Sequence, residues 1–170
     1  MKQVRAYIGI GSNMDDPERQ ARTGTADLRT LPHTTLVRCS SLYRSAPVGP
    51  VAQPDFVNAV CSVDTGLSSE RLLAGLLEIE RKHGRDRGSG RKGGPRTLDL
   101  DLLLYGDERR DDAVLALPHP RLHERAFVLY PLSEIAPGLV VPGRGAVEEL
   151  LRACADQRVS RVQGPTVPPS

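Results

Sequence analysis

The order of the predicted elements indicates an α+β protein with a ferredoxin-like βαββαβ fold. Four segments alternate apolar and polar residues with the period of two that is typical of half-buried strands. Two segments between them show helical spacing, and the resulting order is strand, helix, strand, strand, helix, strand. We therefore expect a mostly antiparallel sheet with its helices packed on one face.

The first half of the chain supplies three of the strands and one helix. Residues 4–10 predict the first strand, which leads into Gly9-Ile10-Gly11. Asp16–Pro17 is typical of a helix N-cap followed by proline in the first turn, and this helix is expected to continue to about Leu31. Residues 35–45 and 55–65 alternate as the second and third strands.

The second half of the chain supplies the other helix and the last strand. Ser68 or Ser69 caps a helix that ends near Gly84, and an apolar strand containing two aspartates follows a glycine-rich loop. Residues 121–135 predict a broken helix and 146–155 a short one.

Length and composition limit the classes of protein to consider. A chain of 170 residues fits one domain, expected at 1–158, with 159–170 as a disordered tail. The net charge of +2 gives no general argument for nucleic acid, and no apolar run is long enough to span a bilayer. We expect a cytoplasmic monomer without membrane or nucleic-acid partners.

The three scattered cysteines do not indicate a disulfide framework, and Cys39 and Cys61 are expected to be small buried thiols.

Two aspartates in an apolar strand are the strongest sign of chemistry. Asp99 and Asp101 share one strand face, about 7 Å apart at their roots, while leucines alternate with them. Two like charges on one face repel each other and need a cation. A hard divalent ion such as Mg²⁺ carrying phosphate groups can supply it, and so can a neighbouring arginine such as Arg96.

A basic stretch precedes the aspartates. Residues 81–96 contain seven lysines and arginines against the single acid Asp86, and residues 84–94 include five glycines. A solvated basic loop is one interpretation. The alternative is a polyphosphate-binding lid, because guanidinium groups match phosphate oxygens and the stretch leads directly into the two carboxylates.

Other candidate residues carry weaker signals. Gly9 and Gly11 resemble a phosphate loop only slightly, and a tight turn is enough to explain them. Phe56 and Asn58 fall on the strand face opposite Val57, where a ring and an amide suit a flat heterocycle. His119 lies between two prolines near several arginines, so it is either structural or a phosphate contact.

Four segments together resemble the 6-hydroxymethyl-7,8-dihydropterin pyrophosphokinases of folate biosynthesis. In the family's order they are Tyr7–Asn13, Ser40–Ala59, Gly94–Asp101 and Pro118–Leu129. The resemblance implies an ATP-dependent kinase that transfers a pyrophosphoryl group to the hydroxymethyl oxygen of the pterin and releases AMP. The chain departs from the family at Lys92–Gly93, where many members carry tryptophan, so lid contacts should differ.

The resemblance also implies roles for individual residues. Asp99 and Asp101 would hold two Mg²⁺ ions, and Arg85 and Arg96 would stabilise the transferring phosphates. The nucleotide site would contain Glu80, Arg87, Leu102, His119 and Arg125. The pterin would contact Ser45, Ala46, Val48 and Asn58, with its ring stacked between Phe56 and Phe127.

Two other functions remain open on the residues alone. A two-metal phosphohydrolase would use the same aspartates together with a base that positions water. A ferredoxin-like nucleic-acid binder would use the basic loop and aromatic side chains on the sheet face. Carboxylates in the middle of that face would repel phosphate unless a metal is bound.

Overall fold

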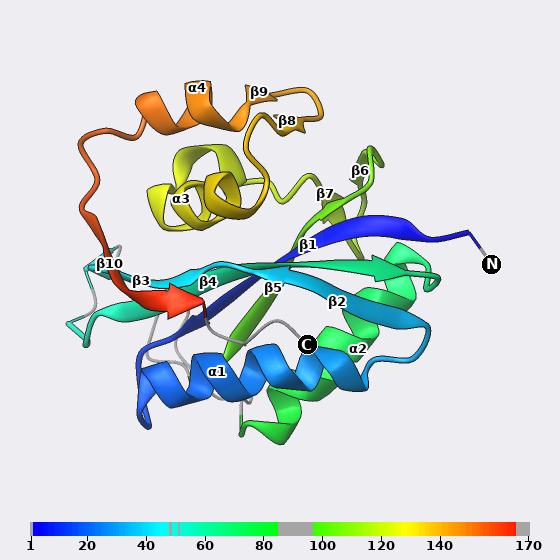
Figure 1. Cartoon of the computed structure of the whole chain (residues 1–170), viewed down its shortest axis with the longest axis horizontal. Coiled ribbons are helices and arrows are strands. Elements are labelled where there is room, and N and C mark those ends of the chain that lie inside the picture. The colour runs from blue at the N-terminus through cyan, green and yellow to red at the C-terminus, as the bar shows by residue number, and fades with distance from the viewer. Residues whose placement is uncertain (1, 48, 51, 85–96, 166–170) are drawn as a thin grey trace.

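A computed structural model describes residues 2–47, 49–50, 52–84 and 97–165, which form a central sheet with helices around it (Figure 1). Six strands form the sheet, in the order β10-β3-β4-β1-β5 with β2 also paired to β4. These strands are β1 Val4–Ser12, β2 Thr34–Cys39, β3 Ser41–Ser45, β4 Phe56–Thr65, β5 Asp99–Tyr105 and β10 Val159–Pro165. Two small hairpins comprise β6 Arg110–Asp111 with β7 Ala116–Leu117, and β8 Val140–Val141 with β9 Gly145–Ala146. The helices are α1 Pro17–Asp27, η1 Leu28–Thr30, α2 Ser69–Lys82, η2 Leu122–Glu124, α3 Ala126–Ile135 and α4 Val147–Arg152.

The element order confirms the predicted βαββαβ arrangement, and the strands of the main sheet pair antiparallel. The strand expected over 35–45 is divided at Ser40, whose Oγ atom accepts a hydrogen bond from the Val60 N–H at 2.9 Å. As a result, β2 pairs with the C-terminal half of β4, and β3 pairs with its N-terminal half.

Local capping begins both helices of this unit. The Asp16 carboxylate accepts a hydrogen bond from the Arg19 N–H at 3.4 Å, and the Ser68 hydroxyl accepts one from the Arg71 N–H at 3.2 Å. Helix α2 buries the predicted stripe of Leu72, Leu76 and Ile79. Within the described ranges, no helix has the length and apolarity needed to cross a membrane.

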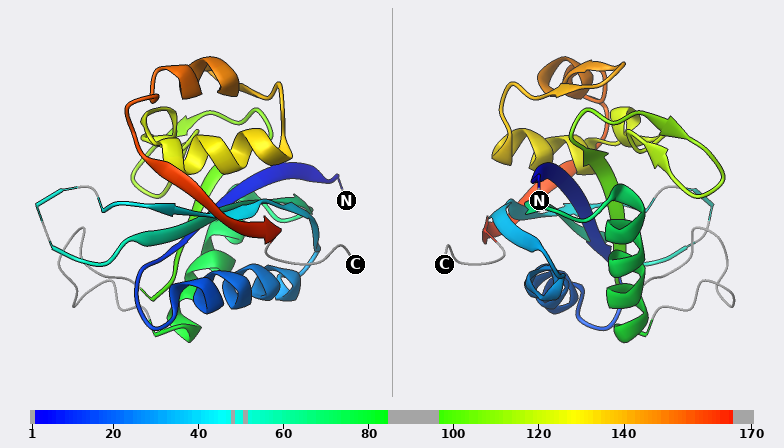
Figure 2. Two further views of the ribbon diagram at one scale, coloured as in Figure 1. Left: turned by 60° about the vertical axis from the view of Figure 1, so that its left-hand side comes forward. Right: turned by 90° about the vertical axis from the view of Figure 1, so that its right-hand side faces the viewer.

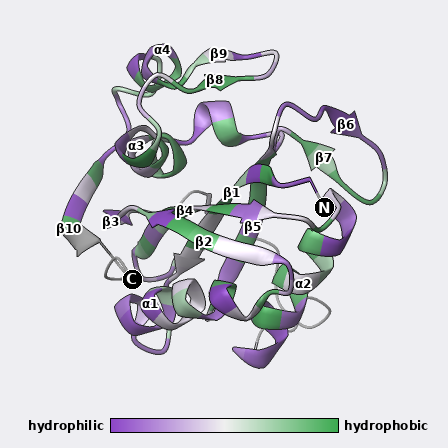
Figure 3. Ribbon diagram, turned by 45° about the vertical axis from the view of Figure 1, so that its right-hand side comes forward, coloured by the Kyte–Doolittle hydropathy of each residue, from purple (hydrophilic) through white to green (hydrophobic). Residues whose placement is uncertain are grey.

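Helices cover both faces of the sheet, so the expectation of helices on one face holds for α1 and α2 alone. One buried cluster, which includes Ile8 and Leu100, lies between the sheet and these two helices. A second cluster, which includes Tyr7 and Val60, lies on the opposite face beneath α3 and α4 (Figure 2). The reason is the composition of α3, which is largely hydrophobic and buries most of its length (Figure 3).

Glu134 anchors α3 to the sheet. Its carboxylate accepts hydrogen bonds from the Ser41 backbone N–H at 3.0 Å and from the Tyr43 hydroxyl at 2.6 Å. Burial and the adjacent carboxylate raise the pKa of Tyr43. These contacts fix α3 over β3, beside the strands that carry the site residues.

The alternation predicted for β5 breaks at Leu103. Tyr7 pairs with Leu104 and Ile8 pairs with Leu102, so Leu103 is the extra residue of a β-bulge. Leu103 and Leu104 therefore both pack on the α3 side, although Leu104 was expected to face the other way. The two aspartates precede the bulge and keep their shared face.

The expectation of a disordered tail from residue 159 is wrong for residues 159–165. These residues form β10, in which Val159 pairs with Ser45 and Ser160 pairs with Arg44. The added strand satisfies backbone groups that β3 would otherwise leave at the edge of the sheet. Residues 166–170 lie outside the described part of the chain.

Candidate active site

A row of paired residues crosses the sheet face opposite α1 and α2. Asn58 of β4 pairs with Gly11 of β1, and Gly11 pairs in turn with Asp99 of β5. In the next row, Gly9 pairs with Asp101. Side chains of directly paired residues lie on the same side of an antiparallel sheet, so Asn58 and Asp99 face one space, about 10 Å apart across two strand spacings.

The backbone of Gly11 forms the floor between these two side chains, and Gly9 lies one row away. Gly9 and Gly11 lie inside β1, so their interpretation as a tight turn is wrong. A methyl group on Gly11 would come within 3.4 Å of the Asn58 Oδ1 atom, and one on Gly9 within 3.4 Å of Leu103. The absence of a side chain at Gly11 leaves room above the strand between the amide and the carboxylate.

The two carboxylates have the donor chemistry that Mg²⁺ prefers. Asp99 and Asp101 are half-buried, and the neighbouring Leu98 and Leu100 are buried on the other face. Among the described residues, no three His, Cys, Asp or Glu side chains gather into a closed metal cage. Mg²⁺ commonly uses one or two carboxylates and keeps water and substrate phosphates as its other ligands. The pair therefore fits magnesium that arrives with a polyphosphate.

Glu80 supports the strand between the two aspartates. Its side chain is only 2% exposed, and its Oε2 atom accepts a hydrogen bond from the Leu100 N–H at 2.6 Å. The contact joins the last turn of α2 to β5 at the residue between Asp99 and Asp101. Glu80 thus holds the backbone that presents the two carboxylates, and its contact with the nucleotide stays a prediction.

Asn58 and Ser45 form one polar unit of the predicted pterin site. The Asn58 Nδ2 atom donates a hydrogen bond to the Ser45 Oγ atom at 2.7 Å, and both side chains are buried. Phe56 pairs with Ser45 across β3 and β4 and is half-buried, whereas Ala46 is exposed. With Nδ2 directed to Ser45, the Asn58 Oδ1 acceptor lies over Gly11.

Phe127 and Arg125 lie at the N-terminal end of α3. The Arg125 guanidinium carbon is 5.5 Å from the centre of the Phe127 ring, within the range of a cation–π contact. Both side chains are half-buried. The contact brings together one residue predicted for the nucleotide site and one predicted for the pterin site.

His119 is held beside the bulge of β5 in its neutral form. Its backbone N–H donates to the Leu103 carbonyl at 2.9 Å, and its Nδ1 atom accepts a hydrogen bond from the Arg121 N–H at 3.2 Å. Burial lowers the pKa of His119 to about 4, with Arg125 and Arg121 adding to the shift and Asp99 opposing it. Because Nδ1 is an acceptor, the ring proton is on Nε2, so the neutral imidazole can donate one hydrogen bond.

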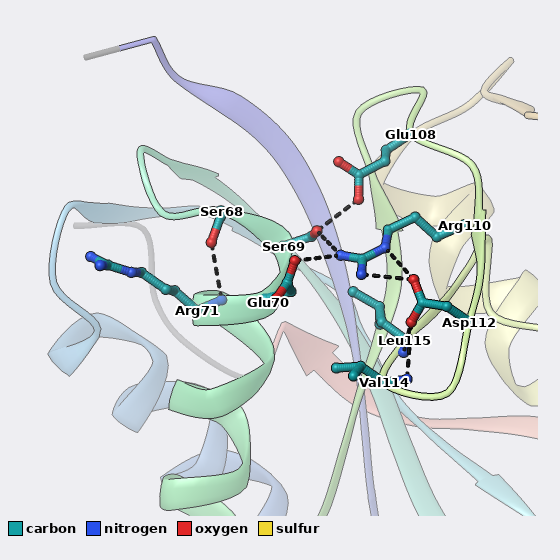
Figure 4. A network of polar contacts seen from close by, with 9 residues as sticks. All are labelled: Ser68, Ser69, Glu70, Arg71, Glu108, Arg110, Asp112, Val114 and Leu115. Carbon is teal, nitrogen blue, oxygen red and sulfur yellow. Dashed lines mark hydrogen bonds and ion pairs between the residues drawn. The ribbon is translucent and has the colours of Figure 1, made fainter.

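A polar network fixes the hairpin that leads to His119 (Figure 4). Arg110 on β6 donates to Glu70 at 3.1 Å, to the Ser69 hydroxyl at 3.3 Å, and to Asp112 at 2.8 and 3.0 Å. The Ser69 hydroxyl in turn donates to Glu108 at 2.7 Å. The network ties the hairpin to the N-terminal end of α2.

Comparison with known proteins identifies the family. Residues 7–137 match the model of the 7,8-dihydro-6-hydroxymethylpterin-pyrophosphokinase family (HPPK). The chain belongs to this family. It is 44% identical over 160 residues to the 2-amino-4-hydroxy-6-hydroxymethyldihydropteridine pyrophosphokinase of Pseudomonas aeruginosa, covering 94% of this chain and 98% of that protein. It is 43% identical over 159 residues to the enzyme of the same name from Haemophilus influenzae, covering 94% and 98%.

Solved structures of HPPK-DHPS proteins show the same fold. Wild-type Plasmodium falciparum HPPK-DHPS matches with a TM-score of 0.65 at 12% identity, covering 89% of this chain and 45% of that one. Another HPPK-DHPS structure, solved in complex with substrates, matches with a TM-score of 0.67 at 11% identity, covering 92% and 44%. This chain thus spans less than half the length of those proteins.

One residue that the resemblance assigned to the nucleotide site turns its side chain away from it, and four other assigned residues lie outside the described part of the chain. The side chain of Leu102 is only 3% exposed and packs in the cluster beneath α1 and α2, so only its backbone can face the site. Arg85, Arg87, Arg96 and Val48 lie outside the described residues.

Asn13 was not predicted as a site residue. Its side chain is 1% exposed, and its Nδ2 atom donates to the Gln53 Oε1 atom at 2.8 Å and to the Pro54 carbonyl at 3.0 Å. These contacts join the end of β1 to the segment before Phe56. The only sequence signal was its place after Gly11 in a segment that matches the HPPK family.

Proposed function

We propose that this chain transfers the pyrophosphoryl group of ATP to 6-hydroxymethyl-7,8-dihydropterin and releases AMP. The observation that carries the proposal is the row of Asn58, Gly11 and Asp99, which places an amide and a carboxylate on opposite sides of an open glycine floor. Membership of the HPPK family supports the reaction type.

The amide side of the floor suits the pterin. The Oδ1 atom of Asn58 can accept a hydrogen bond from an N–H group on the edge of the pterin ring. The hydrogen bond to Ser45 fixes the orientation of the amide before substrate arrives, which lowers the ordering cost of binding. Phe56 and Phe127 are proposed to stack on the two faces of the ring, with Ala46 and Val48 at its edge.

The carboxylate side of the floor suits the triphosphate. Asp99 and Asp101 would hold two Mg²⁺ ions, which supply charge neutralisation and polarise the phosphoryl oxygens. Neutral His119 would donate its Nε2–H to an oxygen of the nucleotide, and Arg125 would add positive charge. The proposed roles of Arg85, Arg87 and Arg96 rest on the resemblance.

The chemistry follows from which bond must break. Release of AMP requires the hydroxymethyl oxygen to attack the β-phosphorus, while the bridging oxygen to the α-phosphorus leaves with AMP. Such a transfer depends on in-line positioning and on charge stabilisation more than on covalent help from the protein. The two ends of the row hold the two substrates in this geometry, and the glycine floor leaves room for the reacting hydroxymethyl group between them.

A binding experiment tests the arrangement of the two sides. Because the chain contains no tryptophan, the fluorescence of the pterin can be followed without an indole background. We expect Asn58→Ala to weaken pterin binding at least tenfold and to leave the binding of Mg²⁺ and a non-hydrolysable ATP analogue within twofold. Equal effects on both ligands would contradict the assignment of Asn58 to the pterin side.

A further inference from the structure

Two of the three cysteines are direct neighbours across two strands. Cys39 at the end of β2 pairs with Cys61 in the middle of β4. Cys61 is fully buried in the cluster beneath α1, and the half-buried Cys39 packs against the same cluster. All three cysteines are reduced in the structure. Their scattered positions in the sequence gave no indication of this pairing.

The hydrogen bonds next to the pair define its geometry. The Ser40 N–H donates to the Val60 carbonyl at 2.9 Å, and the Val60 N–H donates to the Ser40 Oγ atom at 2.9 Å. The first of these bonds joins the backbone groups directly next to Cys39 and Cys61, which is the pattern that flanks a non-hydrogen-bonded pair in an antiparallel ladder. In such pairs the Cα atoms are about 4.5 Å apart and the side chains approach each other, which lies within the range that a disulfide spans.

We propose that Cys39 and Cys61 are a modification site at which a low-molecular-weight disulfide forms a reversible cross-strand bond between β2 and β4. The thiolate of Cys39, the more accessible of the two, attacks one sulfur of the external disulfide, forms a mixed disulfide and releases one thiolate. The sulfur of Cys61 then attacks Cys39, passes its proton to the leaving thiolate and completes the protein disulfide. The external disulfide is reduced to two thiols, and the protein loses two hydrogens.

The environment of Cys61 is consistent with this order of steps. Burial raises the pKa of its thiol well above the ordinary value, with the adjacent Cys39 adding to the shift. The Cys61 Sγ atom also lies 3.9 Å from the Thr25 hydroxyl of α1, which closes the inner side of the pair. Cys61 therefore acts only on a sulfur brought to it by Cys39, as a resolving thiol does.

The test compares the purified protein before and after incubation with oxidised glutathione. We expect the intact mass to fall by two hydrogens, and digestion without reductant to give one peptide that joins Cys39 to Cys61. Cys154→Ser, which removes the thiol on the opposite face, should behave the same way. Cys39→Ser and Cys61→Ala, with their folding checked by circular dichroism, should not form the bond. A stable glutathione adduct on Cys39, or two thiols that remain open to alkylation, would overturn the proposal.

A second measurement tests whether the bond suits the native geometry. A cross-link that closes the segment between two native neighbours restricts the unfolded chain, so the oxidised protein should melt roughly 5–10 °C above the reduced protein. Addition of dithiothreitol should reverse the shift. An unchanged or lower melting temperature in fully oxidised protein would show that the bond strains the sheet and would overturn the proposed site.

Discussion

The Oε2 atom of Glu80 on α2 accepts a hydrogen bond from the backbone N–H of Leu100 on β5, at a distance of 2.6 Å. Leu100 separates Asp99 from Asp101, so a buried carboxylate fixes the strand at the point where it presents the two proposed metal ligands. The hydrogen bond thereby joins α2 directly to β5, the next strand along the chain.

This contact predicts an asymmetric response to substitution at Glu80. Glu80→Ala removes the acceptor and leaves the Leu100 N–H without it in a buried position, so the free energy of unfolding should fall by about 2–3 kcal/mol. Glu80→Gln keeps a carbonyl oxygen that can accept the same hydrogen bond, so its free energy of unfolding should fall by less than that of Glu80→Ala. Urea unfolding of the three proteins measures both values, and equal losses would show that the hydrogen bond to Leu100 is not the stabilising feature.

The glycine floor predicts a substrate-selective effect of one methyl group. Gly11→Ala places a methyl beneath the proposed pterin, 3.4 Å from Asn58 Oδ1, and should raise the pterin dissociation constant roughly tenfold or more. Gly9→Ala is the matched control, since its methyl faces Leu103 instead. Titration of each variant with pterin and with the ATP analogue separates the effects. An unchanged pterin affinity in Gly11→Ala would contradict the proposal that the pterin lies over the backbone of Gly11.

The carboxylate pair predicts loss of turnover with an intact fold. Asp99→Asn or Asp101→Asn removes a charge that would hold Mg²⁺, so kcat should fall roughly 10²–10³-fold or more. Asp111→Asn is the control: it changes an exposed aspartate of β6, and its kcat should stay near the wild-type value. Steady-state kinetics and melting curves measure activity and folding. Near-normal activity in either β5 variant would contradict the metal assignment.

The half-buried imidazole of His119 predicts a dependence of stability on pH. The pKa of His119 is about 4 in the folded protein, against about 6.5 for an unperturbed histidine, so the unfolded chain binds more protons between these values. Stability should therefore be fully present above pH 6.5 and be lost as pH falls toward 4, by about 3 kcal/mol at most. His119→Asn should flatten this part of the profile.

The measurement is the free energy of unfolding against pH, made without metal or nucleotide. Nuclear magnetic resonance titration of the His119 ring should give a midpoint near the same low value. A midpoint near the ordinary value of about 6.5 would contradict the lowered pKa, and a midpoint above pH 7 would mean that the ring is mostly charged at neutral pH and would remove the proposed neutral donor.

The sequence was informative where a feature depends on local pattern. The period of two placed Asp99 and Asp101 on one face, and the capping residues placed the starts of α1 and α2. The opposite positions of Phe56 and Val57 on β4 also followed from alternation.

Other features depend on register between distant strands, which alternation alone does not define. The glycine floor exists because Gly11 pairs with both Asn58 and Asp99, and the bulge at Leu103 is a mismatch between β1 and β5. Strand β10 mixes apolar and polar residues without a regular alternation and forms by pairing with β3. Its signal therefore lies in the partner strand and not in residues 159–165.

The central claim is tested most directly by the nucleotide product. The protein is mixed with ATP, Mg²⁺ and 6-hydroxymethyl-7,8-dihydropterin, and the nucleotides are separated over time. The account predicts one AMP for each pterin diphosphate formed, with no AMP when the pterin is omitted. Formation of ADP or inorganic phosphate in place of AMP would contradict it.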